Sequence, residues 1–140
     1  MQQIDYATCP INVLTEIIIH EVYQTYFMYG PGLFERVYEA TLEGRLKERG
    51  LRVERQTLVT ITNRYVNNEP GYYADLIVEG RVILELKSVL KLNNVVYTQL
   101  RSHLRLAKIS VGYVVNFNCK FLKDNIKRVV HNYDPAVHDF

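Results

Sequence analysis

Between residues 72 and 88, three charged side chains interrupt two apolar segments that flank a glycine turn. The stretch reads YYADLIVEGRVILELKS, and Asp75, Glu85 and Lys87 stand where apolar side chains would fold more readily. Two carboxylates in neighbouring strands can bind Mg²⁺, which takes hard oxygen ligands and keeps open positions for water and substrate phosphates. An amine on the same face can hold an attacking water and stabilise the charge that develops on a phosphate. Hydrolysis of a phosphate ester is the chemistry that suits these three residues.

The turn between the two strands decides whether the two carboxylates meet. If residues 79–81 form the turn, Val78 pairs with Val82, and Asp75 lies directly across from Glu85. A turn one residue shorter would place Asp75 opposite the leucine before Glu85 instead. The carboxylate pair therefore requires the longer turn or a compensating bulge.

Side chains alternate between the two faces of a strand, so the sequence also predicts which residues share a face. One face is expected to carry Tyr72, Ala74, Leu76 and Val78. The other face is expected to carry Tyr73, Asp75, Ile77, Ile83, Glu85 and Lys87. Two like charges side by side are destabilising without a counter-charge, so we expect a cation to bind there. The alternative is a solvated sheet face on which Lys87 neutralises its neighbours.

Two helical segments are expected to bring further polar side chains to the sheet. On the helix predicted for residues 33–50, Glu35 lies at the edge of the apolar arc and should face the sheet. Its alternative role is that of a boundary residue whose carboxylate bends to water. On the helix at 95–107, Gln99 stands one turn before His103, and this pair could reach a phosphate, although Gln99 alone is more typical of a surface amide.

The elements that must position these residues follow from hydrophobic periodicity and turn signals. Helical spacing covers residues 10–28, 33–50 and 95–107, and strands are expected within 51–65, 72–78, 82–88, 111–118 and 126–130. The sequence predicts one α/β domain over residues 1–140, in the order ααβββαββ, with a core at about 29–130 preceded by an N-terminal helix at about 10–28. A frayed tail is expected at 131–140.

Composition narrows the classes of protein. Hydrophobic residues make up 48% and charged residues 23% of the 140 residues, which is typical of one globular domain. A net charge of +2 is compatible with nucleic acid but falls short of a strongly basic DNA-binding domain. No secretory signal and no bilayer-length apolar run are recognisable, so we expect a cytoplasmic protein without a membrane partner, in which Cys9 and Cys119 are reduced thiols.

A combination of motifs resembles a known family. GLFERVY at 32–38 has the form G-x-x-E-x-x-Y, and it is followed by the charged hairpin, by TQLRSHLRL, by VGYVVNFN and by the basic close IKRVV. From about residue 29 to 130 the chain resembles the GxxExxY protein family, a branch of the PD-(D/E)XK nuclease superfamily. This resemblance implies a central mixed β-sheet flanked by helices, with a magnesium-dependent phosphodiesterase site at one end.

The resemblance also implies roles for single residues. Asp75 corresponds to the aspartate of the superfamily motif, Glu85 and Lys87 correspond to its E-x-K, and Glu35 corresponds to the acid of the preceding helix. The expected Mg²⁺ or Mn²⁺ ligands are Asp75, Glu85, the backbone carbonyl of Leu86, and Glu35 directly or through water. Lys87 is expected to orient the nucleophile.

Further positions match the family less closely. Gln99 corresponds to the glutamine of a Q-x-x-x-Y motif, but His103 stands in place of its tyrosine, and Ala74 replaces the signature proline. A histidine there could still stack on or hydrogen-bond to nucleic acid. Contacts to flanking phosphates are expected from the basic residues Lys91, Arg101 and Arg105.

The sequence thus predicts a metal-dependent nuclease that acts on nucleic acid, with DNA favoured. One alternative is a catalytically silent module of the same fold that binds nucleic acid or protein, and another is an enzyme acting on a different phosphate ester. A homodimer is left open, because the 11 tyrosines could form an interface but core packing explains them equally well.

Overall fold

The computed structural model describes residues 3–132, so most of the tail expected at 131–140 lies outside the described residues. The elements follow one another as α1 (Ile11–Tyr29), α2 (Glu35–Glu48), β1 (Val53–Ile61), β2 (Glu69–Val78), β3 (Val82–Lys87), α3 (Val95–Ala107), β4 (Val111–Asn116), the short 3-10 helix η1 (Leu122–Asn125) and β5 (Ile126–Val130). The predicted order and the mixed α/β class are confirmed. Among residues 3–132, no helix combines the length and apolar character that a membrane span requires.

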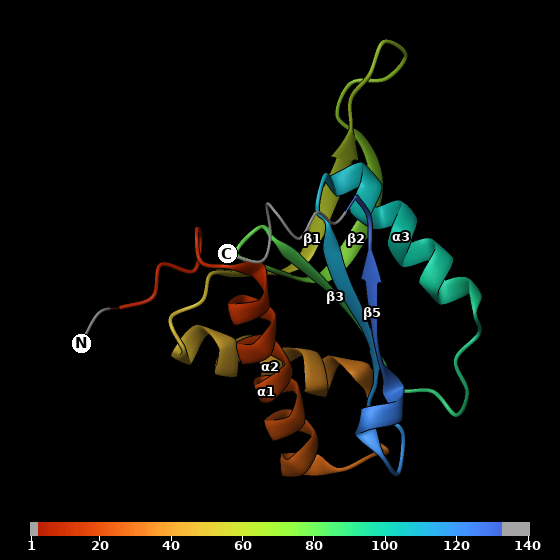
Figure 1. The fold of residues 1–140 in the computed structure, drawn as a ribbon. Helices are drawn as coiled ribbons and strands as arrows, with labels where there is room; N and C mark the ends of the chain where they lie inside the picture. The colour runs from red at the N-terminus through yellow and green to blue at the C-terminus, as the bar shows by residue number, and fades with distance from the viewer. Residues whose placement is uncertain (1–2, 133–140) are drawn as a thin grey trace.

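The strands form one sheet in the order β1-β2-β3-β4-β5. Neighbouring strands are antiparallel except β3 and β4, which run parallel. A parallel pair needs a long crossover, and α3 supplies it. Helix α3 covers one face of the sheet, while α1 and α2 lie on the other (Figure 1). The sheet is therefore covered by helices on both sides.

Each face of the sheet has its own apolar cluster. On the α1 and α2 side, Leu14, Ile18 and Val22 recur every fourth residue and are fully buried, as the helical period predicts. On the other side, Leu100 and Leu104 of α3 pack against β3, β4 and β5. Helix α1 thus contributes to the same core as the segments that follow it.

The hairpin between β2 and β3 has the longer of the two turns considered. Val78 pairs with Val82, and the Arg81 N–H donates to the Val78 carbonyl at 2.9 Å, so residues 79–81 form the turn. The ladder between the strands ends after three pairs, at Leu76 and Leu84. Beyond that point β2 continues along β1 and β3 continues along β4. Residues 75 and 85 therefore lie where the two strands part.

The predicted alternation of side chains along β2 is wrong at one point. We expected Tyr72, Ala74, Leu76 and Val78 to share a face. The first two instead pack in the cluster on the α3 side, and the last two pack in the other cluster. In β1, Gln56 has a left-handed φ of 49°, and the register steps from the pair of Arg55 to that of Thr57 without a pair at Gln56. Because of this irregular backbone opposite Asp75, the side chains of residues 72 and 74 point to one face of the sheet and those of residues 76 and 78 point to the other.

The packing of α3 on the sheet can be tested at Gly112 of β4. A Cβ there would lie 3.0 Å from the Ile83 carbonyl oxygen and 3.2 Å from methyl groups of Leu100 and Leu104. We expect Gly112→Ala to lower the free energy of unfolding in urea by about 1–3 kcal/mol, because neither backbone nor helix can yield easily. The matched control is Gly44→Ala in α2, where no atom lies within 4 Å. That change should stabilise the protein by about 1 kcal/mol, and an unchanged urea midpoint for Gly112→Ala would contradict the close packing.

Candidate active site

The G-x-x-E-x-x-Y segment joins α1 to α2, and its tyrosine holds it in place. The Tyr38 hydroxyl donates to the Gly30 carbonyl at 2.6 Å and accepts from the Leu33 N–H at 3.2 Å. The fully buried Tyr38 ring stacks on Phe117, with ring centroids 4.3 Å apart. Gly32 has a φ of 102°, a conformation that favours glycine. The connection between the helices is therefore a fixed loop clamped onto the core.

The same loop is attached to the end of β3 through Ser88. The Ser88 N–H donates to Oε1 of Glu35 at 3.3 Å, and the Ser88 hydroxyl donates to the Leu33 carbonyl at 2.6 Å. Ser88 directly follows Lys87, the last residue of β3. Glu35 is exposed, so it stands at the rim of the site, beside the E-x-K segment.

Asp75 fills the place where β2 and β3 part. Its Oδ2 accepts from the backbone N–H of Leu86 at 2.8 Å, and its Oδ1 accepts from the Gln56 side-chain amide at 3.1 Å. Burial raises the pKa of Asp75, the Leu86 N–H opposes that rise, and the charge of Glu39 adds to it. The carboxylate is thus bound to the backbone of the residue after Glu85.

Glu85 is the most perturbed acid of the group. Burial, and next the charge of the neighbouring Asp75, raise its pKa to about 8, while Lys87 opposes the rise. Its side chain is 12% exposed, and its Oε1 is buried without a hydrogen-bond partner among residues 3–132. Nδ1 of His103 lies 3.7 Å from that oxygen and is likewise buried and unpartnered. Although this spacing would suit an ion pair, burial favours the neutral form of both groups.

His103 forms the wall of the site on the α3 side. Its ring stacks on Tyr72 at 3.7 Å between centroids, and the Tyr72 hydroxyl donates to the His103 carbonyl at 2.6 Å. Burial, and then the charge of Lys87, lower the pKa of His103. Burial and the charge of Glu85 raise the pKa of Tyr72 to about 12. A strand tyrosine and a helix histidine thus close the gap between β2 and α3.

Sequence reasoning missed a second acid on α2. Glu39, one turn after Glu35, is 5% exposed and accepts from Arg55 at 2.7 Å. It also accepts from the side-chain amide of Gln56, which donates to Asp75 as well. The spacing of four residues from Glu35 on one helix face could have indicated it. Glu39 therefore acts on Asp75 through a shared amide and through its charge.

The remaining predicted residues lie around this group. Gln99 is exposed on α3, and Lys91 is exposed in the connection after β3. Arg101 and Arg105 are exposed and line a pocket of about 140 Å³ together with Thr98, Ser102 and His131. On a helical wheel of about 100° per residue, these arginines point away from His103. The structure thus brings Asp75, Glu85, Lys87 and His103 together and turns the arginine pair to another side of α3.

A metal ion would find two acids in this group, with a third at the rim. Within residues 3–132, no three His, Cys, Asp or Glu side chains are gathered closely enough to hold a metal ion between them. Asp75 and Glu85 nevertheless offer adjacent carboxylates, and a buried Glu85 oxygen lacks a partner. Mg²⁺ is commonly held by one or two carboxylates with water in the other positions. The pair fits such an ion, and Glu35 would have to turn from Ser88 to join it.

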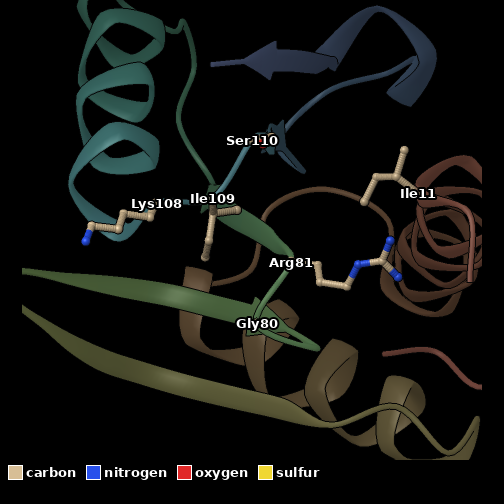
Figure 2. A pocket seen from close by; sticks show the side chains of 6 residues that line it. All are labelled: Ile11, Gly80, Arg81, Lys108, Ile109 and Ser110. Atoms are coloured by element: carbon tan, nitrogen blue, oxygen red, sulfur yellow. The ribbon is translucent and has the colours of Figure 1, made fainter. Parts of the chain in front are cut away.

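A separate pocket lies at the start of β3, the end opposite to Lys87. It measures about 150 Å³, and Arg81, Lys108 and Ile11 are among its lining residues (Figure 2). The Arg81 guanidinium points toward α1 and donates to the carbonyls of Tyr6 and Cys9 at 2.8 and 2.7 Å, whereas Lys108 points away. Arg81 therefore ties the N-terminal segment to the hairpin.

The fold agrees with a comparison to protein families. The family model described as PD-(D/E)XK nuclease superfamily matches residues 12–129, from the first turn of α1 to the end of β5. No curated protein and no solved structure matches the chain. Because the family match covers most of the 140 residues, the chain belongs to the PD-(D/E)XK nuclease superfamily.

Proposed function

We propose that the chain is a nuclease that hydrolyses phosphodiester bonds of nucleic acid, with Mg²⁺ or Mn²⁺ as its cofactor. DNA is the proposed substrate. Membership of the nuclease superfamily supports the reaction class. The observation that carries the proposal is the pair of carboxylates beside Lys87, in which burial and Asp75 raise the pKa of Glu85 to about 8. A bound cation would stabilise both acids in their charged form, and acids with so strongly shifted a pKa cluster at functional sites.

Asp75 and Glu85 would hold the ion. Asp75 is oriented by the Leu86 N–H and by Gln56, and Glu85 has a buried oxygen that accepts no hydrogen bond in the described part of the chain. The backbone carbonyl of Leu86 and the carboxylate of Glu35 are the proposed further ligands. When bound, the ion neutralises phosphate charge and lowers the pKa of a water molecule.

Lys87 would serve the attacking water and the phosphate. Its charge opposes the rise in the pKa of Asp75 and of Glu85, so the ammonium group acts electrostatically on both carboxylates. Its own carbonyl accepts from the Phe117 N–H at 2.9 Å, which fixes the end of β3. From there the ammonium group can orient a water and stabilise negative charge on the phosphate oxygens.

The outer residues would contact the substrate and not the ion. Gln99 and His103 are proposed to contact the substrate from α3, and Lys91, Arg101 and Arg105 are proposed to contact flanking phosphates. The arginine pair, with the hydroxyls of Thr98 and Ser102 in one pocket, suits a phosphate remote from the reacting one. Membership of the narrower GxxExxY family, a cytoplasmic location and a homodimer remain predictions.

A second candidate function is a silent nuclease-fold module that binds nucleic acid. It is favoured by the position of Glu35, whose carboxylate accepts from Ser88 instead of joining Asp75 and Glu85. Such a module would bind nucleic acid equally well with and without a divalent ion. Metal dependence therefore separates the two functions.

The first test measures metal binding and cleavage together. Mn²⁺ at about 100 times its Kd should stabilise the protein by about 2.7 kcal/mol, seen as a rise in Tm, and should permit cleavage of a DNA oligonucleotide. Asp75→Asn should abolish both effects, because it removes one of the two carboxylates. The control Asp124→Asn, at an exposed acid of η1, should change neither. Stabilisation by Mn²⁺ without cleavage, or equal stabilisation of Asp75→Asn, would contradict the proposal.

The second test concerns Lys87. Lys87→Met should lower the cleavage rate by about 10²-fold or more while Mn²⁺ still raises the Tm, because the amine acts on water and phosphate. The control Lys47→Met removes an exposed lysine of α2 that pairs with Glu43. It should cleave like the unaltered protein. A Lys87→Met protein that cleaves at the original rate would exclude the proposed role.

The third test uses the pH dependence of stability in EDTA. In the unfolded chain Glu85 loses its proton near the ordinary pKa of 4.5, whereas the folded protein retains it up to about 8. The free energy of unfolding should therefore fall as pH rises from 4.5 to 8, by an amount on the order of a few kcal/mol. Glu85→Gln should match the unaltered protein near pH 4.5 and exceed it near pH 8.

Two further groups, His103 and Glu48, show whether the pH dependence of stability comes from Glu85. The lowered pKa of His103 acts in the opposite direction, since its contribution is lost as pH falls through 6.5, and it is common to both proteins. Glu48→Gln changes an exposed acid at the end of α2 and should leave the pH profile unaltered. Parallel profiles for Glu85→Gln and the unaltered protein would mean that Glu85 titrates normally.

A further inference from the structure

An exposed aromatic ring stands on a fixed backbone beside the proposed site. Phe34 is 81% exposed, although it directly precedes Glu35. The residues on both sides of it are bound to Ser88, through the Leu33 carbonyl at 2.6 Å and the Glu35 carboxylate at 3.3 Å. An apolar ring left in water on a fixed backbone gains little from burial within the described part of this chain. Its position suits contact with a ligand.

The ring belongs to a pocket that has the chemistry of a nucleotide site. The pocket measures about 500 Å³ and is lined by Leu33, Phe34, Glu35, Arg36 and Ser88. Its size falls in the range of small-ligand sites. Arg36 is exposed and forms no ion pair with any residue between 3 and 132. An aromatic face and an unpaired cation thus stand together, next to the strand end that carries Lys87.

We propose that this pocket binds an unpaired nucleotide of the substrate, with its base stacked on Phe34 and its phosphate on Arg36. The proposal rests on the nuclease function and names its substrate class, nucleic acid that is single-stranded or locally unpaired. A base within a duplex has both faces covered by its neighbours, so only an unstacked base can lie on a protein ring. Stacking of this kind accepts any base and needs a flat apolar surface.

The position of the pocket favours a nucleotide over a protein partner. Glu35 lines the pocket and is also the rim acid of the proposed site, so the pocket borders the site and lies within reach of a strand bound there. Arg36 adds positive charge where an anionic strand would run. Other exposed apolar side chains at Phe27, Met28 and Phe121 line no part of this pocket.

The test measures stacking directly, in EDTA, so that no cleavage occurs. The probe is a single-stranded DNA oligonucleotide with 2-aminopurine at one position, whose fluorescence is quenched when the base stacks. We expect the protein to bind it and quench it, and Phe34→Ala to bind about 5- to 100-fold more weakly and to lose the quenching. Phe34→Tyr keeps the ring and should restore both. The same oligonucleotide as RNA shows whether the sugar matters.

Two controls confine the effect to this pocket. Tyr65→Ala removes a ring that is 77% exposed, in the connection between β1 and β2, at the opposite end of the molecule from the loop between α1 and α2 (Figure 1). It should leave binding and quenching unaltered. The fully paired duplex should bind with an affinity that does not depend on Phe34.

The outcomes separate this inference from the nuclease function. Phe34-dependent binding in EDTA without any cleavage in Mn²⁺ would support the pocket and contradict hydrolysis. Cleavage in Mn²⁺ with single-strand binding independent of Phe34 would contradict the pocket alone. The inference is also wrong if the protein binds no single strand, or if Phe34→Ala changes only the oligomeric state in sedimentation, which would make this face a contact between copies.

Discussion

The hydrogen bond from the Leu86 backbone to the Asp75 carboxylate is the interaction on which the site depends. The ladder between β2 and β3 stops at Leu76 and Leu84, so a backbone donor next to the gap needs another acceptor. Asp75 supplies it, and this places a carboxylate inside the sheet layer. Burial, and next the charge of this carboxylate, raise the pKa of Glu85. Asp75 thus satisfies the backbone N–H where the two strands part. Its negative charge beside Glu85 is unfavourable, and a bound cation would neutralise it.

A strained position in the neighbouring strand orients that carboxylate. Gln56 adopts a left-handed φ of 49°, which is unfavourable for a residue with a side chain. In this conformation its amide donates to both Glu39 and Asp75. Glu39 is in turn neutralised by Arg55 at 2.7 Å. The strain is therefore offset by a hydrogen-bond network that links α2, β1 and β2 and that orients Asp75 through Gln56.

The elements and their order could be predicted from sequence, because periodicity and turn chemistry are local properties, whereas the choice between a two-residue and a three-residue turn after β2 required the structure. The side-chain phase of β2 also required the structure, since it depends on the distortion at Gln56, which lies in another strand. The burial of Glu39 could not be predicted, because it depends on Arg55 as a partner and the helix sequence alone does not reveal that partner. The role of Tyr38 also required the structure, since its hydroxyl acts on a loop that precedes it.

The two candidate functions differ in whether the Glu35 carboxylate can join a metal ion held by Asp75 and Glu85. The hydrogen bond between Glu35 and Ser88 is 3.3 Å long and exposed, so water can replace the carboxylate there at a cost of about 1 kcal/mol. The loop that carries Glu35 is fixed by Tyr38 and by the Ser88 hydroxyl, and neither contact involves the carboxylate. The side chain can therefore turn without disturbing its backbone. A divalent charge near Asp75 and Glu85 would attract it more strongly than one neutral N–H group, so the present contact is compatible with a third ligand that joins on metal binding.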